Sequence, residues 1–197
     1  MSHELIAAFV IFAVATLFTP GPNNIMLMAS GLNFGWARTL PHGFGVTLGF
    51  GFMVLVVGFG LGAVFAAYPL AYQVLKYVGA AYLLYLAWRI ANATSAHGSA
   101  RARPFTFVQA AAFQWVNAKA WVMAIGAVTA YAGIAAFPVN TVLIAAIFTV
   151  LGTVSAFTWV LFGTGLKNLV NDPRSVRIFN LVMAGLLAAS LIPVFLE

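Results

Sequence analysis

The fold is decided by residues 5–32, which read LIAAFVIFAVATLFTPGPNNIMLMASGL. An apolar run from Leu5 to Phe18 meets Thr19-Pro20-Gly21-Pro22-Asn23-Asn24 and resumes at Ile25. A helix must break at these prolines, because each one removes a backbone donor and clashes with the preceding turn. The 28 residues would extend about 42 Å as one helix, which exceeds the roughly 30 Å hydrocarbon core of a bilayer. We therefore expect a membrane helix that is broken inside the bilayer.

Backbone groups freed at that depth need partners or a water-lined cavity. The half-helix that restarts near Asn24 would direct its positive dipole end and unpaired N–H groups into such a cavity, which suits a carboxylate. A kink that is absorbed by neighbouring helices is the alternative. On the first interpretation, the candidate substrate-binding residues of this stretch are Thr19, Pro20, Gly21, Pro22, Asn23 and Asn24.

The composition excludes an ordinary water-soluble globule. Of the 197 residues, 63% are hydrophobic and 6% are charged, against roughly 45–50% and about 25% in soluble domains. The 9 basic residues outnumber the 3 acidic ones but form no stripe, so nucleic acid is not expected as a partner. The absence of cysteine excludes disulfides and thiolate metal sites.

Six apolar segments predict an all-α integral membrane protein with six transmembrane helices. They are Leu5–Leu32, Leu40–Phe65, Ala71–Trp88, Phe107–Phe137, Val139–Phe162 and Ile178–Leu196. Three helices in each half force the second half to run upside down relative to the first, which is the inverted-repeat plan of many secondary transporters. We expect one transmembrane domain, 1–197, made of repeat one (1–92), a basic cytoplasmic loop (93–104) and repeat two (105–197), with the first helix of each half interrupted.

The basic residues indicate the orientation of the chain. Seven of the 9 fall in the connections that become internal when the N-terminus is outside, and they are Arg38, Arg89, Arg101, Arg103, Lys167, Arg174 and Arg177. Both termini are therefore expected on the outer side, with Lys76 as an anchor near an outer helix end. The polar stretches Asn92–Pro104 and Leu166–Val176 are expected to be short loops.

The fourth segment is the second anomaly, because it carries Gln114, Asn117 and Lys119 within an apolar run. A lysine at the centre of a membrane helix costs roughly 2.5–3.5 kcal/mol on insertion scales, so it should face a cavity or a partner. Alternatively, Lys119 snorkels to the inner interface. One anomaly in the first helix of each half favours a substrate site near the midplane.

The acidic residues Glu4, Asp172 and Glu197 all lie near segment ends. A metal ion or a cationic substrate would therefore lack deep carboxylate partners. A zwitterion fits better: its carboxylate would meet Lys119 and the half-helix, and its ammonium would meet Asn23, Asn24, Asn117 or the face of Trp115 or Trp121. Lys119 is also the main deep candidate for binding a proton. No catalytic dyad or triad and no cofactor site is indicated.

Two further features have alternative interpretations. Gly45 and Gly49, and Gly58 and Gly62, have the GxxxG spacing that permits close helix packing, although glycine hinges could also serve a transport motion. His42, beside Pro41, is expected to be an interfacial hydrogen-bonding residue, with a proton carrier as the alternative.

The chain resembles the LysE/RhtB family of bacterial amino-acid exporters over essentially its whole length. The strongest match is the stretch from Thr19 to Asn24. Further matches are Ser30, Gly31, Gly35, Gly45, Gly49, Lys76, Gly79, Ala80, Tyr82, Leu83, Trp88, Asn117, Lys119, Ala120, Trp121, Asn180, Met183 and Gly185. The family usually has Asn-Pro-Lys in the fourth segment, whereas Ala118 stands here, which is similar to the branch that exports cysteine and O-acetylserine.

The resemblance implies secondary active export of small neutral amino acids or their derivatives across the bacterial inner membrane, coupled to protons as an antiport. The expected partners are a small zwitterionic amino acid, protons and the lipid bilayer, and homo-oligomerisation is left open. A passive channel or facilitator for small polar solutes is the alternative, followed by a polytopic membrane enzyme.

Overall fold

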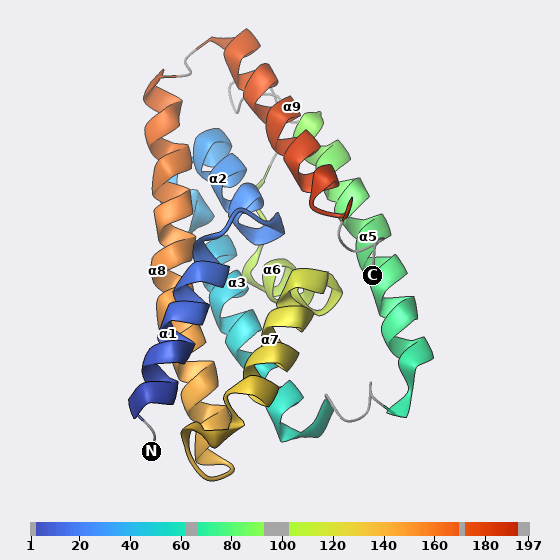
Figure 1. The fold of residues 1–197 in the computed structure, drawn as a ribbon. Helices are drawn as coiled ribbons and strands as arrows, with labels where there is room; N and C mark the ends of the chain where they lie inside the picture. Colours follow the sequence, from blue (N-terminus) through green and yellow to red (C-terminus); the bar gives the residue numbers. More distant parts are fainter. Residues whose placement is uncertain (1–2, 62–66, 93–102, 170–171, 193–197) are drawn as a thin grey trace.

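The computed structural model describes residues 3–61, 67–92, 103–169 and 172–192, and every regular element within them is helical (Figure 1). The α-helices are α1 (His3–Phe18), α2 (Pro22–Phe34), α3 (Trp36–Val56), α5 (Pro69–Ala91), α6 (Phe107–Phe113), α7 (Ala118–Ala130), α8 (Val139–Leu169) and α9 (Pro173–Ala189). Short helical turns of other types are η1 (Val57–Leu61), η2 (Gln114–Val116) and η3 (Ala132–Ile134). The all-helical class expected from the sequence is confirmed for this part of the chain.

The first predicted break is present between α1 and α2, whose axes differ by 52°. Gly21 is extended (φ −170°, ψ 179°), and Pro22 is the first residue of α2. Proline is well suited to that position, because the first N–H group of a helix has no intrahelical acceptor. The two prolines therefore end one helix and begin the next.

A second break interrupts the fourth apolar segment although it contains no proline. α6 passes into η2, and Asn117 is extended (φ −90°, ψ 104°) before α7 begins at Ala118. The indole Nε1 of Trp121 donates to the carbonyl of Trp115 at 2.9 Å, so a side chain of α7 binds backbone on the other side of the break. The expected interruption in the first helix of the second half is thus found.

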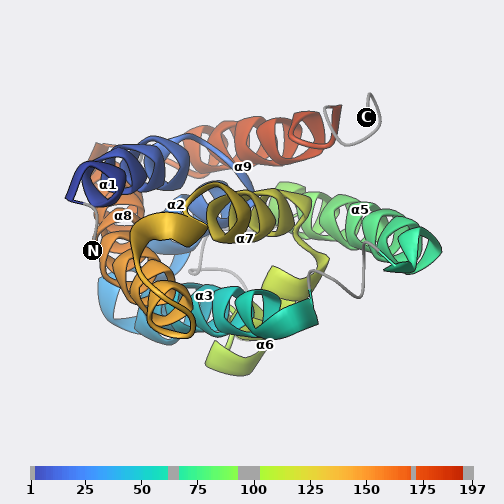
Figure 2. The same cartoon turned by 60° about the horizontal axis from the view of Figure 1, so that its bottom comes forward.

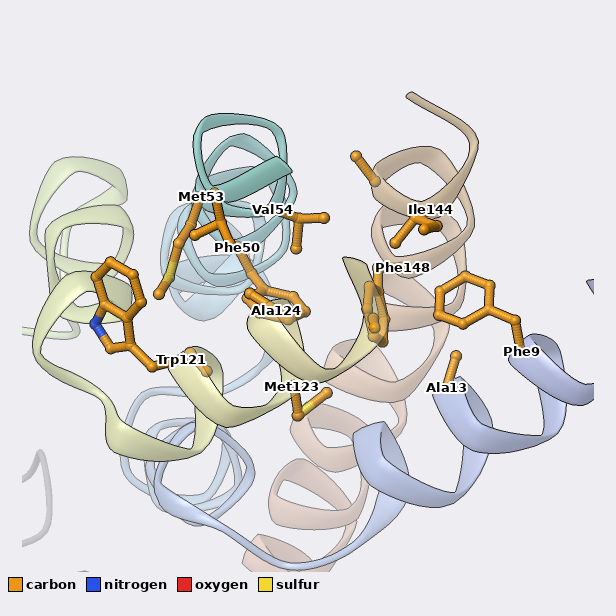
Figure 3. Packing of buried hydrophobic residues seen from close by; sticks show 14 of the residues in the cluster. Phe9, Ala13, Phe50, Met53, Val54, Trp121, Met123, Ala124, Ile144 and Phe148 are labelled. Atoms are coloured by element: carbon orange, nitrogen blue, oxygen red, sulfur yellow. The ribbon is translucent and has the colours of Figure 1, made fainter. Parts of the chain in front are cut away.

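α8 lies along α2 and α3 on one side of the molecule, while α5 pairs with α9 on the other (Figures 1 and 2). The largest buried cluster joins α1, α3, α7 and α8 (Figure 3). In it, the rings of Phe9 and Phe148 meet edge to face with centroids 4.9 Å apart. This cluster packs α1, which precedes the first break, together with α7, which follows the second.

Glycines set the closest helix contacts. A Cβ atom on Gly45 or Gly49 would lie less than 3.0 Å from backbone atoms of α6, and one on Gly163 would meet the backbone of Met28 in α2 at a similarly short range. The packing role predicted for Gly45 and Gly49 is therefore confirmed. Gly62 lies outside the described residues.

The outer surface is apolar, as expected for contact with lipid. Exposed side chains include Ile11 on α1, Val154 and Leu161 on α8 and Leu181 on α9. Within the described ranges, Trp36–Gly60 and Val139–Leu166 are long and apolar enough to cross a membrane, and the bent α1–α2 pair makes a third candidate. An α-helical membrane protein is supported, and the six-span inverted repeat stays a prediction.

Several predicted boundaries were wrong. α8 continues to Leu169 instead of ending at Phe162, and α9 begins at Pro173, so most of the expected loop Leu166–Val176 is helical. The start of α9 has a local reason: the carboxylate of Asp172 accepts hydrogen bonds from the N–H groups of Arg174 and Ser175 and caps the helix. Of the predicted loop 93–104, residues 93–102 lie outside the described part of the chain.

Candidate functional site

The two helix breaks contact each other, although they are about a hundred residues apart in the sequence. Lys119, in the first turn of α7, donates from Nζ to the carbonyl of Thr19 at 3.0 Å. Asn23 and Gln114 form a reciprocal amide pair, with Nδ2 to Oε1 at 2.8 Å and Nε2 to Oδ1 at 3.1 Å. These bonds join the start of α2 to the segment between α6 and α7.

Side chains donate hydrogen bonds to the backbone carbonyl groups that the first break leaves without helical partners. The Nδ2 group of Asn24 donates to the carbonyls of Leu17 and Thr19 at 2.8 and 3.0 Å. The hydroxyl of Ser155 in α8 donates to the same Leu17 carbonyl at 2.8 Å. The break is therefore a hydrogen-bonded structure, because unpaired carbonyls would be costly in an apolar environment.

A cavity of about 50 Å³ lies between the breaks and is bounded by α1, α2, α3, α7 and α8. Six of the nine predicted site residues line it, namely Gly21, Pro22, Asn23, Asn24, Asn117 and Lys119. We refer to this space as the transport cavity.

The remaining predicted residues lie around the transport cavity and do not line it. Thr19 and Pro20 are exposed, and Thr19 contributes its carbonyl to Lys119. Gln114 is fully buried, where its Nε2 group also donates to the carbonyl of Ala110 at 2.9 Å. Trp121 belongs to the apolar core (Figure 3), and neither it nor Trp115 lines the cavity.

The electrostatics of the transport cavity favour an anion. Lys119 lies half-buried in its wall, and the N-terminal ends of α2 and α7 both border it. Helix N-termini carry partial positive charge and stabilise anions. No Asp or Glu of the described residues lines the cavity, so its positive groups have no carboxylate of the chain to balance them there.

The same cavity also contains a hydrogen-bond acceptor that is available. Asn117 is 2% exposed, and its Oδ1 atom has no hydrogen-bond partner among the described residues. A buried acceptor without a partner costs about 1–3 kcal/mol. Asn117 is therefore suited to accept a hydrogen bond from a donor that enters the cavity.

Sequence reasoning missed several polar residues of the cavity wall, which are Thr16, Thr47 and Ser155. All three lie within apolar helices, and Thr47 and Ser155 are buried. The signal was present, because small hydroxyl residues interrupt apolar runs at these positions. It was not specific, since such residues usually bond to their own helix, as Thr16 does to the carbonyl of Phe12.

Comparisons with known proteins identify the family of this chain. The family model described as LysE type translocator matches residues 14–193. The chain belongs to this family. The LysE type translocator is thus a transporter and not an enzyme, and the resemblance inferred from the sequence is confirmed.

The translocator is also similar to curated proteins along its full length. Two of them are the cysteine/O-acetylserine efflux proteins of Escherichia coli (strain K12) and Shigella sonnei (strain Ss046). Each is 28% identical over 199 residues, a match that covers 99% of this chain and 100% of the relative. No solved structure matches the translocator.

Proposed function

We propose that this translocator is a secondary active exporter of small neutral amino acids or their derivatives. One observation carries the proposal: the transport cavity contains a lysine ammonium and an acceptor without a partner, Asn117 Oδ1, between two helix breaks. A zwitterion carries one group that complements each of them.

The proposed binding mode uses both ends of the zwitterion. Its carboxylate accepts a charge-assisted hydrogen bond from Lys119 Nζ and lies at the N-terminus of α2, whose partial positive charge stabilises an anion. Its α-ammonium donates to Asn117 Oδ1. A substrate with a net positive charge would leave Lys119 facing a second cation with no carboxylate nearby, so neutral amino acids are favoured.

The relatives named above support a polar amino acid of modest size. Their names specify cysteine and O-acetylserine, both of which are zwitterions with short side chains. The transport cavity measures about 50 Å³, whereas ligand sites usually measure 300 Å³ or more. We therefore propose that α1 or α7 moves to admit the substrate, and that the structure represents a closed state.

For energy coupling we propose antiport with protons, for which Lys119 is the main deep residue that can bind a proton. The two halves of the chain would act as inverted repeats that alternate the access of the cavity, in the bacterial inner membrane and with both termini outside. The alternative, a passive facilitator, differs in one measurable property. Export against a concentration gradient that collapses on addition of a protonophore supports antiport, and export that only follows the gradient supports the facilitator.

The function is tested by expressing the protein in bacteria that are fed dipeptides and measuring every amino acid in the medium. We expect cysteine, O-acetylserine or another neutral amino acid to accumulate faster than with Lys119→Ala protein at equal membrane abundance. If no amino acid accumulates although the protein is present in the membrane, the proposal is wrong.

A further inference from the structure

A second and larger cavity lies near the opposite end of α2. It measures about 310 Å³ and is bounded by the C-terminal half of α2, the start of α3, the end of α5 and residues 103–105. Its polar lining includes Ser30, Asn33, His42, Arg89 and Arg103. We call this space the arginine chamber.

The arginine chamber is positively charged. The exposed side chains of Arg89 and Arg103 lie in its wall, and no Asp or Glu of the described residues lines it. Asn33 is already paired, since it donates to Asn180 Oδ1 at 3.0 Å. Ser30 is paired with the hydroxyl of Thr39 at 3.0 Å. The two guanidinium groups are therefore the main groups available to an anion, and Arg is the side chain best matched to a carboxylate.

His42 is the second and independent observation. Its side chain is 2% exposed, and neither ring nitrogen has a hydrogen-bond partner in the part of the chain that the structure describes. The interfacial hydrogen-bonding role predicted for it was wrong, since its closest ring neighbour is Phe105, with centroids 5.3 Å apart. Because buried polar groups normally have hydrogen-bond partners, an unpartnered imidazole ring in the wall of a charged chamber indicates that a ligand supplies its partner.

The geometry connects the arginine chamber with the transport cavity. Asn23, Ser30 and Asn33 lie at positions i, i+7 and i+10 of α2 and share one face of that helix. Asn23 lines the transport cavity, and the other two line the arginine chamber. Ten residues of helix span about 15 Å, so the two sites lie a few turns apart along α2, with the apolar Met26 and Leu27 between Asn23 and Ser30.

We propose that the arginine chamber is a capture site for the carboxylate of the exported solute, which Arg89, Arg103 and His42 bind before the solute reaches Lys119. This inference rests on the proposed function. By the predicted orientation the chamber opens on the inner side, from which an exporter takes its substrate. Its volume of about 310 Å³ lies at the lower end of the roughly 300–1,000 Å³ usual for ligand sites, which suits a small solute.

The first test measures binding without transport. Lys119→Ala protein in detergent is heated with sodium acetate. The controls are acetamide and sodium chloride, and the ionic strength is the same in all samples. Acetate is expected to raise the unfolding temperature, because a ligand of the folded state stabilises it, and the rise should disappear in Lys119→Ala/Arg103→Gln protein. Equal shifts of the unfolding temperature in both proteins would overturn the proposal that the chamber binds a carboxylate. Because this test involves no efflux, its result does not depend on whether the protein exports amino acids.

The second test measures efflux from vesicles loaded with increasing concentrations of O-acetylserine. Arg103→Gln and His42→Leu should each raise the half-saturating internal concentration about tenfold while the maximal rate stays within about twofold of wild type. Arg177→Gln, an exposed arginine of α9 outside both cavities, is the matched control. Wild-type concentration dependence in both chamber variants would overturn the proposal.

His42→Leu also separates a binding role from a packing role. If His42 only fills space, replacing an unpartnered polar ring by an apolar side chain should stabilise the fold and leave efflux unchanged. We expect stabilisation together with impaired capture. Repeating the measurements in vesicles with and without phosphatidylglycerol tests whether a lipid headgroup is the anion that the chamber binds. Stabilisation by this lipid that Arg103→Gln abolishes, with normal efflux, would assign the chamber to a headgroup and overturn solute capture.

Discussion

Replacing Lys119 by alanine should remove the main attraction for the substrate carboxylate while leaving the fold intact. A hydrogen bond to a charged group contributes about 1.5–3 kcal/mol. At 1.4 kcal/mol for each factor of ten, efflux at low substrate concentration should fall by roughly 10- to 140-fold. Loss of a proton-carrying group would add to this reduction under a proton gradient.

The structure explains why folding should survive the substitution. Within the described part of the chain, the Lys119 ammonium donates one hydrogen bond, to the carbonyl of Thr19, and that carbonyl also accepts from Asn24 at 3.0 Å. Truncation therefore leaves no buried carbonyl without a donor. We expect the free energy of unfolding to change by no more than about 1 kcal/mol, which is the net value of an ordinary hydrogen bond.

The assay is efflux of labelled amino acid from vesicles that contain purified Lys119→Ala protein, with thermal unfolding measured on the same sample. Lys76→Ala is the matched control, because Lys76 lies on α5 and lines neither cavity. Near-normal efflux by Lys119→Ala protein would refute the reasoning and would leave Lys119 as a residue that only holds the first break.

Three further outcomes are expected. Asn117→Leu should stabilise the fold by removing an unpartnered buried oxygen, and should raise the KM for efflux about tenfold because the α-ammonium loses its acceptor; unchanged KM would contradict that role. Gly163→Ala should destabilise the protein by 1–3 kcal/mol through collision with the backbone of α2, whereas Gly165→Ala, with open space around it, should be neutral or slightly stabilising in thermal unfolding. Hydrogen bonds from Ser175 and from the Arg174 N–H lower the pKa of Asp172 below its usual 3.8, so its capping contribution is present above that pH and is lost as the pH falls further; the difference in unfolding temperature between wild type and Asp172→Ala should therefore shrink toward zero in strong acid.

The two breaks differ in how far the sequence could predict them. Pro20 and Pro22 act locally, because a proline cannot continue a helix whatever surrounds it. The break at Asn117 is followed by alanine, which favours helix, and the polar residues of that segment together with the expected symmetry of the two halves suggested it. Two bonds accompany its extended conformation, one across the break from Trp121 to Trp115 and one tertiary bond from Lys119 to Thr19, and neither could be read from the residue pattern.

The positions of several candidate site residues could be predicted from their residue types, whereas their contacts could not. Lys119 and Asn117 lie in the transport cavity as expected, because a polar residue in an apolar run has few other favourable positions. Asn23 and Asn24 were expected to be available to the substrate, yet their amides bind Gln114 and the carbonyls of the break. Their partners could not be read from spacing, since one lies 91 residues away.

The bond from the Trp121 indole to the Trp115 carbonyl has a practical consequence for following the transport cycle. Trp121 is 2% exposed and bridges the second break, so any opening of that break changes the surroundings of its ring. The acceptor is a backbone atom, and replacing Trp36, Trp88, Trp115 and Trp159 by phenylalanine therefore keeps the bond while leaving Trp121 as the one tryptophan. Such a protein would carry its own optical reporter, shielded from acrylamide in the closed state and quenched whenever the helix opens.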